Sequence, residues 1–283
     1  MSQIETGSFA PHLTEPPSSI RVVSWNIARG SRLDAVIEFL ATANADVILL
    51  QEVDRHARRT SFQNVAREIA QHLKVHYAFG CEFEELGQGS REAAAHHGQA
   101  TLSRWPIADC SILYFKRQSN FWHPRWFLPS LSLLQRRLGG RMALLTHALI
   151  PGRSLALYNL HFESKGGDDL RYSQLSELLQ HAKRYSLDVP IIVAGDFNFD
   201  VSRPQTASAL AEVGFRNPFA TPGHATTISH SRSARGRAID WILLRGRVVA
   251  TNAQVHDSVL GSDHFPLSLT MRFCGHPDST YCE

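Results

Sequence analysis

The sequence lacks the long apolar run that a membrane-spanning helix requires. Such a helix needs roughly 20 predominantly apolar residues, and no stretch of this 283-residue chain approaches that length. Residues 1–20 also lack the basic start and the apolar run of a signal peptide. These absences argue against a membrane-spanning or exported protein, so we expect a soluble, cytoplasmic one.

Cysteine is scarce and scattered. The four cysteines form no CxxC pair and stand at positions 81, 110, 274 and 282. This spacing indicates neither a zinc ribbon nor a disulfide framework, and it favours a reducing, cytoplasmic setting. Two of these cysteines and His276 are residue types that bind metal, but we interpret residues 274–283 as a flexible C-terminal tail.

Acidic residues are absent from residues 110–162, although the whole chain has 26 Asp and Glu against 29 Lys and Arg. Within this segment, residues 115–141 read as a long loop with room for one short helix, in which bases alternate with aromatic side chains. A segment of one charge sign suits a polyanion or a phosphate group; a solvated face balanced by acids elsewhere in the fold is the alternative. The candidate substrate-binding residues here are Arg117, Trp122, Arg125 and Trp126.

Strand and helix patterns alternate along most of the chain. Short apolar runs such as "RVVSWN", "DVILLQ" and "IIVAGD" predict strands, while Leu175, Leu178, Leu179 and Ala182 have helical spacing. Residues 1–20 read as a disordered lead-in, and no internal repeat or linker divides the rest. We therefore expect one α/β domain over residues 21–273, followed by the tail.

Polar residues stand where the apolar strands end. Each alone is more typical of a cap or a turn, but six such placements favour a functional edge of a sheet, where strand ends pass side chains to loops. The residues concerned are Asn26, Glu52, His161, Asp196 with Asn198, Asp240, and Asp263 with His264.

The motifs that carry these residues resemble those of the endonuclease/exonuclease/phosphatase superfamily. In order they are "WNI", "LLQEVD", "YNLHFES", "VAGDFN", "IDWI" and "SDHFPL", and the resemblance covers residues 22–272. Members include deoxyribonucleases, apurinic-site endonucleases, neutral sphingomyelinases and inositol polyphosphate 5-phosphatases. The resemblance implies a four-layer sandwich, in which two packed mixed β-sheets are flanked by helices, and metal-dependent phosphoester hydrolysis.

The resemblance also implies which residues bind metal and direct water. Glu52 would be the principal ligand of Mg²⁺ or Mn²⁺, with Asn26 beside it and Asp263 as a further candidate. Such ions take oxygen ligands and keep several waters, so few carboxylates are needed. Asp196 would orient or deprotonate the attacking water, and Asn198 would hold the phosphate.

Two histidines have implied catalytic roles. His264 would contact the phosphate or the nucleophile, with its ring fixed by Asp240. His161 matches the histidine that is proposed to protonate the leaving oxygen in the deoxyribonuclease and sphingomyelinase branches. Ser164 stands where family members place a further phosphate-binding group.

Some positions depart from parts of the family. Ala28 stands where some apurinic-site endonucleases carry an acid that touches metal, and His161 stands where that branch has tyrosine. Both differences argue against a dedicated apurinic endonuclease. His161 has no obvious acidic partner, and Gln99 is a candidate neighbour. His96 and His97 are metal-binding residue types, but we interpret them as a solvated loop pair.

The substrate stays open at this point. We modestly favour nucleic acid, because the acid-free segment could stack bases and bind a backbone. A phospholipid or an inositol phosphate is the alternative, since "WFLPSLSLL" flanked by bases could contact a membrane interface. A catalytically silent module that binds a phosphorylated ligand is a third reading, disfavoured by the intact set of ionisable residues. We expect a monomer.

Overall fold

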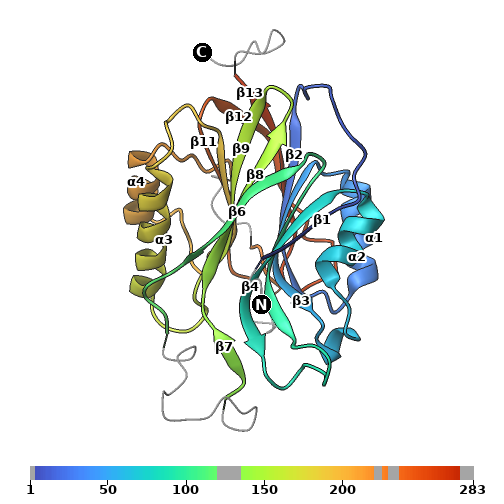
Figure 1. Ribbon diagram of the computed structural model, residues 1–283. Coiled ribbons are helices and arrows are strands. Elements are labelled where there is room, and N and C mark those ends of the chain that lie inside the picture. The colour runs from blue at the N-terminus through green and yellow to red at the C-terminus, as the bar shows by residue number, and fades with distance from the viewer. Residues whose placement is uncertain (1–3, 120–134, 220–224, 229–235, 275–283) are drawn as a thin grey trace.

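The computed structural model describes residues 4–119, 135–219, 225–228 and 236–274. Two β-sheets lie face to face, and helices cover the outer face of each (Figure 1). This arrangement confirms the four-layer sandwich expected from the motifs. Within the described residues, no helix is both long enough and apolar enough to cross a membrane.

The larger sheet has eight strands in the order β1-β4-β5-β3-β2-β13-β12, with β7 paired to β4 beside that path. Strands β2 and β3 pair in parallel, whereas their outer neighbours pair antiparallel. The strand bounds are β1 (Ile4–Ser8), β2 (Ile20–Arg29), β3 (Val47–Arg55), β4 (His76–Glu85), β5 (His96–Ser103), β7 (Arg137–Gly139), β12 (Val248–Val255) and β13 (Leu267–Phe273).

The smaller sheet has five strands in the order β11-β10-β9-β8-β6. Strands β8 and β9 form an antiparallel hairpin, and β9 pairs in parallel with β10. The strand bounds are β6 (Ile107–Tyr114), β8 (Met142–Ile150), β9 (Arg153–His161), β10 (Ile191–Asp196) and β11 (Asp240–Arg245).

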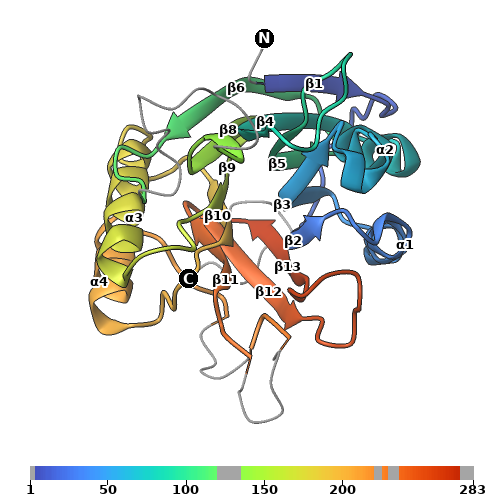
Figure 2. The ribbon, with the colours of Figure 1, turned by 90° about the horizontal axis from the view of Figure 1, so that it is seen from below.

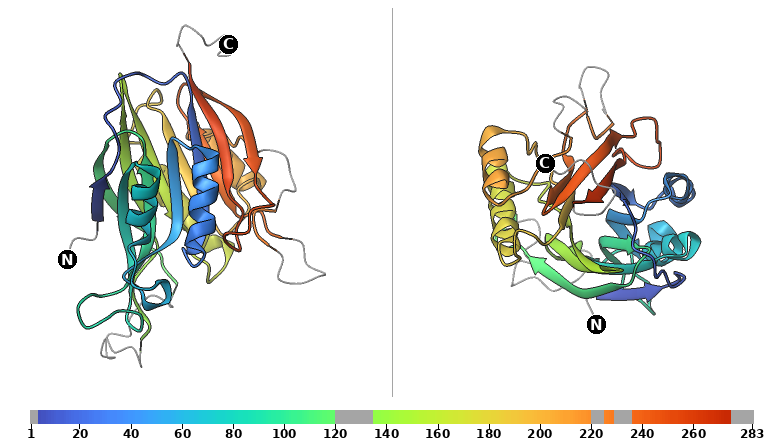
Figure 3. Two further views of the ribbon diagram at one scale, coloured as in Figure 1. Left: turned by 90° about the vertical axis from the view of Figure 1, so that its right-hand side faces the viewer. Right: turned by 90° about the horizontal axis from the view of Figure 1, so that it is seen from above.

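Helices form the two outer layers, as Figures 2 and 3 show. Helices α1 (Leu33–Ala43) and α2 (Val65–Leu73) cover the larger sheet, and α3 (Asp168–Ala182) and α4 (Pro204–Glu212) cover the smaller one. A 3₁₀ turn, η1 (Arg58–Thr60), follows β3. The apolar stripe predicted for α3 faces inward, because its leucines belong to the buried cluster against the smaller sheet.

Residues 191–194 of strand β10 are all apolar because both faces of the strand are buried. Ile191 and Val193 pack in the cluster under α3 and α4, and Ile192 and Ala194 pack in the cluster between the sheets. Parallel strands covered on both faces read as continuous apolar runs rather than as alternating patterns. The buried strand thus holds Asp196 in a fixed position at the edge of the sandwich.

Asn159 of β9 fastens the two sheets together. Its Nδ2 donates to the carbonyl oxygens of Leu50 (3.0 Å) and Ala100 (2.9 Å), and its Oδ1 accepts from Gln51 Nε2 at 2.8 Å. The side chain is fully buried. All of its partners belong to the opposite sheet, so the amide fixes how the sheets are placed relative to each other.

Three features differ from the sequence expectations. The lead-in predicted to be disordered contains β1, which pairs antiparallel with β4, so that prediction is wrong for Ile4–Ser8. In the described part of residues 115–141, β7 pairs with β4, where a loop with one short helix was expected. Cys274 takes part in a disulfide bond, which the scattered cysteines did not indicate.

Glu5 fastens β1 to the sheet by polar contacts. Its carboxylate accepts hydrogen bonds from Tyr77 (2.7 Å) and Asn64 (2.6 Å) and pairs with Arg55 at 2.9 Å. Partial burial alone would raise the pKa of Glu5, but these hydrogen bonds and the charge of Arg55 outweigh it, so the pKa falls below its ordinary value. The ionised form therefore stabilises the folded state.

We predict that Glu5→Gln lowers the free energy of unfolding by about 1 kcal/mol near neutral pH, because Arg55 loses its charged partner. A lowered folded-state pKa stabilises the protein above the unfolded value of about 4.3 and ceases to do so as the pH falls through the folded value. The difference from the wild type, measured by urea denaturation, should therefore shrink in acid. Glu15→Gln, at an exposed position, is the control; a constant difference at all pH values would contradict the assignment.

Candidate metal and phosphate site

Polar strand ends from both sheets meet at one edge of the sandwich. In the larger sheet, Asn26 pairs with Gln51 across the parallel strands β2 and β3. In the smaller sheet, Asp196 pairs with His161 on one side and with Asp240 on the other. Asn26 Nδ2 lies 3.2 Å from Asp196 Oδ2, so the two sets of residues touch across the space between the sheets.

A β-bulge places Glu52 beside this contact. The pairing of β3 with β5 shifts register between Leu50 and Val53, and Glu52 has a positive φ of 51°. Bulges insert an extra residue and re-aim its side chain. Glu52 Oε1 lies 3.5 Å from Asn26 Nδ2, so the bulged carboxylate reaches the residues at the strand ends.

A second bulge, in β4, places another carboxylate, that of Glu82, near Glu52. The pairing of β4 with β5 shifts between Cys81 and Phe83 and leaves Glu82 as the extra residue. Gly98 of β5 permits this close approach, because a Cβ there would lie 1.9 Å from the carbonyl oxygen of Gly80. Glu52 and Glu82 therefore flank β5 from opposite sides.

The ring of His264 is fixed by Asp240. His264 Nδ1 lies 2.9 Å from Asp240 Oδ2, which also accepts a 2.6 Å hydrogen bond from Thr226 Oγ1. His264 Nε2 then faces Asp196 Oδ2 at 3.8 Å. His161 Nε2 approaches the same Asp196 oxygen at 3.4 Å, so two imidazoles converge on one carboxylate.

Burial and neighbouring charges shift the acid–base groups of the site. Desolvation and the nearby Asp240 charge raise the pKa of Asp196. Burial would lower the pKa of His264, but the charges of Asp240 and Asp196 outweigh it, and the pKa of His264 is raised. Burial and the charge of Arg141 lower the pKa of His161 well below its ordinary value. The site therefore favours a protonated His264 and a neutral His161.

The donors present fit a hard divalent cation. Asp196, Asp240 and His264 offer ligand atoms that lie within 4.8 Å of one another. His264 Nδ1 and Asp240 Oδ2 already bond to each other, however, whereas Glu52 accepts, among the described residues, one long contact from Asn26. Mg²⁺ and Mn²⁺ take oxygen ligands. Among these groups, Glu52 has the fewest competing hydrogen bonds within the described residues.

Comparison with known proteins agrees with this geometry. A model of the endonuclease/exonuclease/phosphatase family matches residues 23–264. The chain belongs to this family. It is also 28% identical, over 202 residues, to the inositol phosphosphingolipids phospholipase C of Schizosaccharomyces pombe. That match covers 65% of this chain and 42% of the yeast protein, so the chain spans less than half of that relative.

Solved structures of the family share the fold. The endonuclease/exonuclease/phosphatase from Beutenbergia cavernae superposes with a TM-score of 0.68 at 20% identity, covering 93% of this chain and 74% of that one. The human Nocturnin catalytic domain, solved with a bound sulfate, gives 0.62 at 16% identity and covers 96% and 98%. At these identities the likeness concerns the fold alone.

This edge of the sandwich gathers most of the residues that the sequence singled out. Asn26, Glu52, His161, Asp196, Asp240 and His264 lie together, as the preceding distances show. Asn198 adjoins them: its backbone N–H donates to Asp196 Oδ1 at 2.9 Å, and its Nδ2 donates to the carbonyl of Phe162 at 3.1 Å. Asn198 has a positive φ of 56°, so this turn is held in an uncommon backbone conformation.

Other candidates lie farther out or outside the description. Asp263 is exposed and accepts from Ser262 Oγ at 3.2 Å; among the described residues it bonds to neither Glu52 nor Asn26. The side chain of Arg117 is exposed, and its carbonyl accepts from Gln174. The three remaining substrate-binding candidates lie outside the described residues: Trp122, Arg125 and Trp126.

Sequence reasoning missed a buried ion pair beside His161. Arg141 NH1 lies 2.6 Å from Glu82 Oε1, and its NH2 donates to Ser164 Oγ at 3.1 Å. Gln99, expected near His161, donates to Glu82 Oε2 at 3.2 Å. Arg141 stood out in the sequence only as one of several bases, so no local pattern marked it as part of the site.

The interpretation of His97 as a solvated loop residue is wrong. His97 is 3% exposed, lies on β5, and its Nδ1 is 2.7 Å from Asp54 Oδ1. The sequence did hold a signal, because His97, Gln99 and Thr101 recur with the period of two that puts side chains on one face of a strand.

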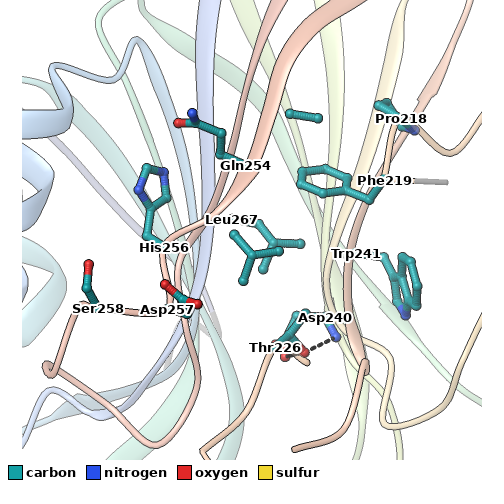
Figure 4. Close-up of a pocket in the computed structure, with 12 residues that line it drawn as sticks. Pro218, Phe219, Thr226, Asp240, Trp241, Gln254, His256, Asp257, Ser258 and Leu267 are labelled. Atoms are coloured by element: carbon teal, nitrogen blue, oxygen red, sulfur yellow. Dashed lines mark hydrogen bonds between the residues drawn. The ribbon is translucent and has the colours of Figure 1, made fainter. Parts of the chain in front are cut away.

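A separate cavity adjoins Asp240 on the side of the sandwich (Figure 4). It has a volume of about 400 Å³ and is lined by Trp241, Gln254 and Leu267, among others. Asp240 and Thr226 line it too, and Figure 4 shows at its lower side the hydrogen bond that the backbone N–H of Asp240 donates to Thr226 Oγ1. Glu52, His161 and Asp196 do not line this cavity, so we assign it no part in the chemistry.

We predict that the backbone strain at Glu52 will appear as a difference in stability between two matched variants. Both Glu52→Gly and Glu52→Ala remove the carboxylate, but only glycine adopts a positive φ without strain. The left-handed conformation costs other residues roughly 1–2 kcal/mol. The glycine variant should therefore be up to about 1 kcal/mol more stable than the alanine variant in metal-free denaturation. An alanine variant of equal or greater stability would contradict the bulge geometry.

Proposed function

We propose that this protein is a metal-dependent phosphodiesterase that cleaves a phospholipid in the manner of a phospholipase C. In this reaction water attacks phosphorus and the P–O bond to the lipid alcohol breaks. The alcohol leaves with a proton, and the phosphate-bearing headgroup is released as a phosphomonoester. The observation that carries the proposal is the convergence of His161, His264 and Asn26 on the single carboxylate of Asp196. That arrangement offers both a proton acceptor and imidazoles close to one reacting phosphate.

Asp196 is the proposed base. Its raised pKa makes the carboxylate a better proton acceptor than an ordinary aspartate, and it is held by Asn26 and by the backbone of Asn198. Asp196 orients the attacking water and takes its proton. The Asn198 turn presents polar groups to the phosphate next to that carboxylate.

The two histidines act on the phosphate and on the leaving group. His264, favoured in its protonated form by Asp240, donates to a phosphate oxygen where negative charge develops. His161 donates a proton to the departing alcohol oxygen. In the free protein the lowered pKa keeps His161 neutral. The negative charge of a bound phosphate raises that pKa again, so His161 takes up its proton when the substrate binds.

Glu52 and Asn26 would hold the divalent cation. Bound there, the ion would neutralise charge on a phosphate oxygen and so ease attack. Glu52 keeps the ionised form that this requires: burial would raise its pKa, but the charges of His97, Arg29 and Arg141 lower it below the ordinary value.

A lipid substrate is now better supported than nucleic acid. The nuclease reading rested on the basic aromatic segment, whose tryptophans lie outside the described residues. The curated relative at 28% identity is named as a phospholipase C acting on inositol phosphosphingolipids. We therefore take a phospholipid phosphodiester as the substrate class and treat nucleic acid as an outcome that the assay must test.

We predict Mg²⁺- or Mn²⁺-dependent hydrolysis of lipid by the purified protein, abolished by chelator. The assay compares sphingomyelin, inositol-containing lipids, plasmid DNA and bis-(p-nitrophenyl) phosphate. Asp196→Asn should lower kcat by about 10²–10⁴, because the base is lost. Asp200→Asn is the matched control, since the side chain of Asp200, within the described residues, hydrogen-bonds to Ser202, from whose backbone N–H it accepts at 2.8 Å.

Two results would overturn parts of this proposal separately. Cleavage of DNA without cleavage of lipid would replace the substrate class and leave the site intact. Activity that persists in chelator, or in Asp196→Asn, would reject the mechanism itself.

We predict that His161→Gln slows lipid hydrolysis far more than hydrolysis of the nitrophenyl ester. A lipid alkoxide is a poor leaving group that needs a proton, whereas nitrophenolate departs without one. The general acid contributes about 10²–10⁴ to the first reaction and little to the second. Equal losses on both substrates would assign His161 to binding.

A further inference from the structure

The molecule contains a second histidine whose ring is fixed by a buried aspartate. His97 Nδ1 lies 2.7 Å from Asp54 Oδ1, and Asp54 is fully buried. Arg59 holds that aspartate from the other side through Nε (2.6 Å) and NH2 (2.8 Å). The His97 ring also stacks on Phe83, with ring centroids 4.6 Å apart and planes 22° apart. The imidazole is therefore locked in position and in rotation.

The contact with Asp54 also selects the tautomer. The nitrogen that faces a carboxylate carries the hydrogen, so in the neutral ring Nδ1 is the donor and Nε2 keeps a free lone pair. Among the described residues, Nε2 makes no hydrogen bond, whereas Nδ1 faces Asp54. A fixed acceptor atom thus remains available near the site.

The pairing of β5 with its neighbours places His97 near the bulge that carries Glu52. His97 pairs with Asp54 at the second residue pair beyond the bulge that carries Glu52, and with Phe83 directly beyond the bulge that carries Glu82. When protonated, His97 exerts the largest of the influences that lower the pKa of Glu52, ahead of Arg29 and Arg141, which reflects its closeness to this carboxylate. No direct hydrogen bond or ion pair joins His97 to Glu52 among the described residues.

We propose that His97 is a positioning residue of the metal site, whose Nε2 accepts a hydrogen bond from a water carried by the cation on Glu52. Divalent magnesium and manganese keep several waters when few carboxylates bind them, so outer acceptors help to orient them. Asp54 and Arg59 hold the ring for this task, as Asp240 holds His264. The inference rests on the metal site proposed above and is independent of the lipid substrate.

A purely structural role is the competing explanation. In that case His97 serves only to donate a hydrogen bond to Asp54 and to stack on Phe83, and its Nε2 accepts no hydrogen bond from a metal-bound water. Asparagine at this position keeps an amide donor for Asp54 but lacks an atom at the place of Nε2. Glutamine and methionine have the same length as each other and both reach that place, but only glutamine carries an acceptor there.

The test is Mn²⁺ binding to the full-length protein by isothermal titration calorimetry, with the spectrum of bound Mn²⁺ recorded by electron paramagnetic resonance. We expect His97→Met and His97→Asn to raise the dissociation constant about tenfold or more, the range for groups that support metal ligands. His97→Gln should recover much of that loss and restore the wild-type spectrum. His96→Asn is the control, because His96 bonds to Arg55 (3.1 Å) rather than to Asp54.

The outcomes separate the two proposals. A wild-type protein that binds no Mn²⁺ rejects the metal site and with it the proposed function. A wild-type protein that binds Mn²⁺, with His97→Gln and His97→Met binding equally well, overturns the role of His97 alone. If His97→Asn does not fold, as judged by circular dichroism, the glutamine and methionine pair decides the question, because both lose the Asp54 contact equally.

Discussion

The site depends on one buried amide that sets the distance between the two sheets. Asn26 and Glu52 come from the larger sheet, while His161, Asp196 and Asp240 come from the smaller one. Asn159, two residues before His161, bonds to the backbone and a side chain of the opposite sheet at the level just below Glu52. A sheet shifted by one residue would separate groups that now lie 3–4 Å apart. The buried hydrogen bonds of Asn159 thus keep the strand-end residues of the two sheets at short distances from one another.

The sequence predicted the residues at the strand ends, because buried strands and their polar termini are local patterns. Asp196 follows an apolar run, and the four-layer fold is what the family resemblance of the ordered motifs implies. What the sequence could not reveal are contacts that depend on bulges. Glu82 and Arg141 are 59 positions apart and meet only because β4 takes an extra residue next to Gly98. His97 could have been inferred from its period of two, but the adjacent His96 suggested a loop.

Electrostatics explain why so many ionisable groups tolerate burial together. Asp240 is compensated by His264, Asp54 by Arg59, and Glu82 by Arg141, each within hydrogen-bond distance. Removing one partner of such a pair leaves an uncompensated charge, which costs more than the pair contributes when intact. Glu52 and Asp196 are compensated less completely. In the proposed function these are the two groups that meet the cation and the attacking water.

The outer edge of β4 is covered along both of its halves by the chain itself. Strand β1 pairs with residues 76–80, and β7 pairs with residues 83–85, on either side of the bulge. Unpaired sheet edges invite strands of other molecules, and short edge strands reduce that risk. With five and three residues, β1 and β7 are short in this sense. Removal of the N-terminal segment would uncover part of a long strand, so it would promote self-association of the protein even where catalysis is unaffected.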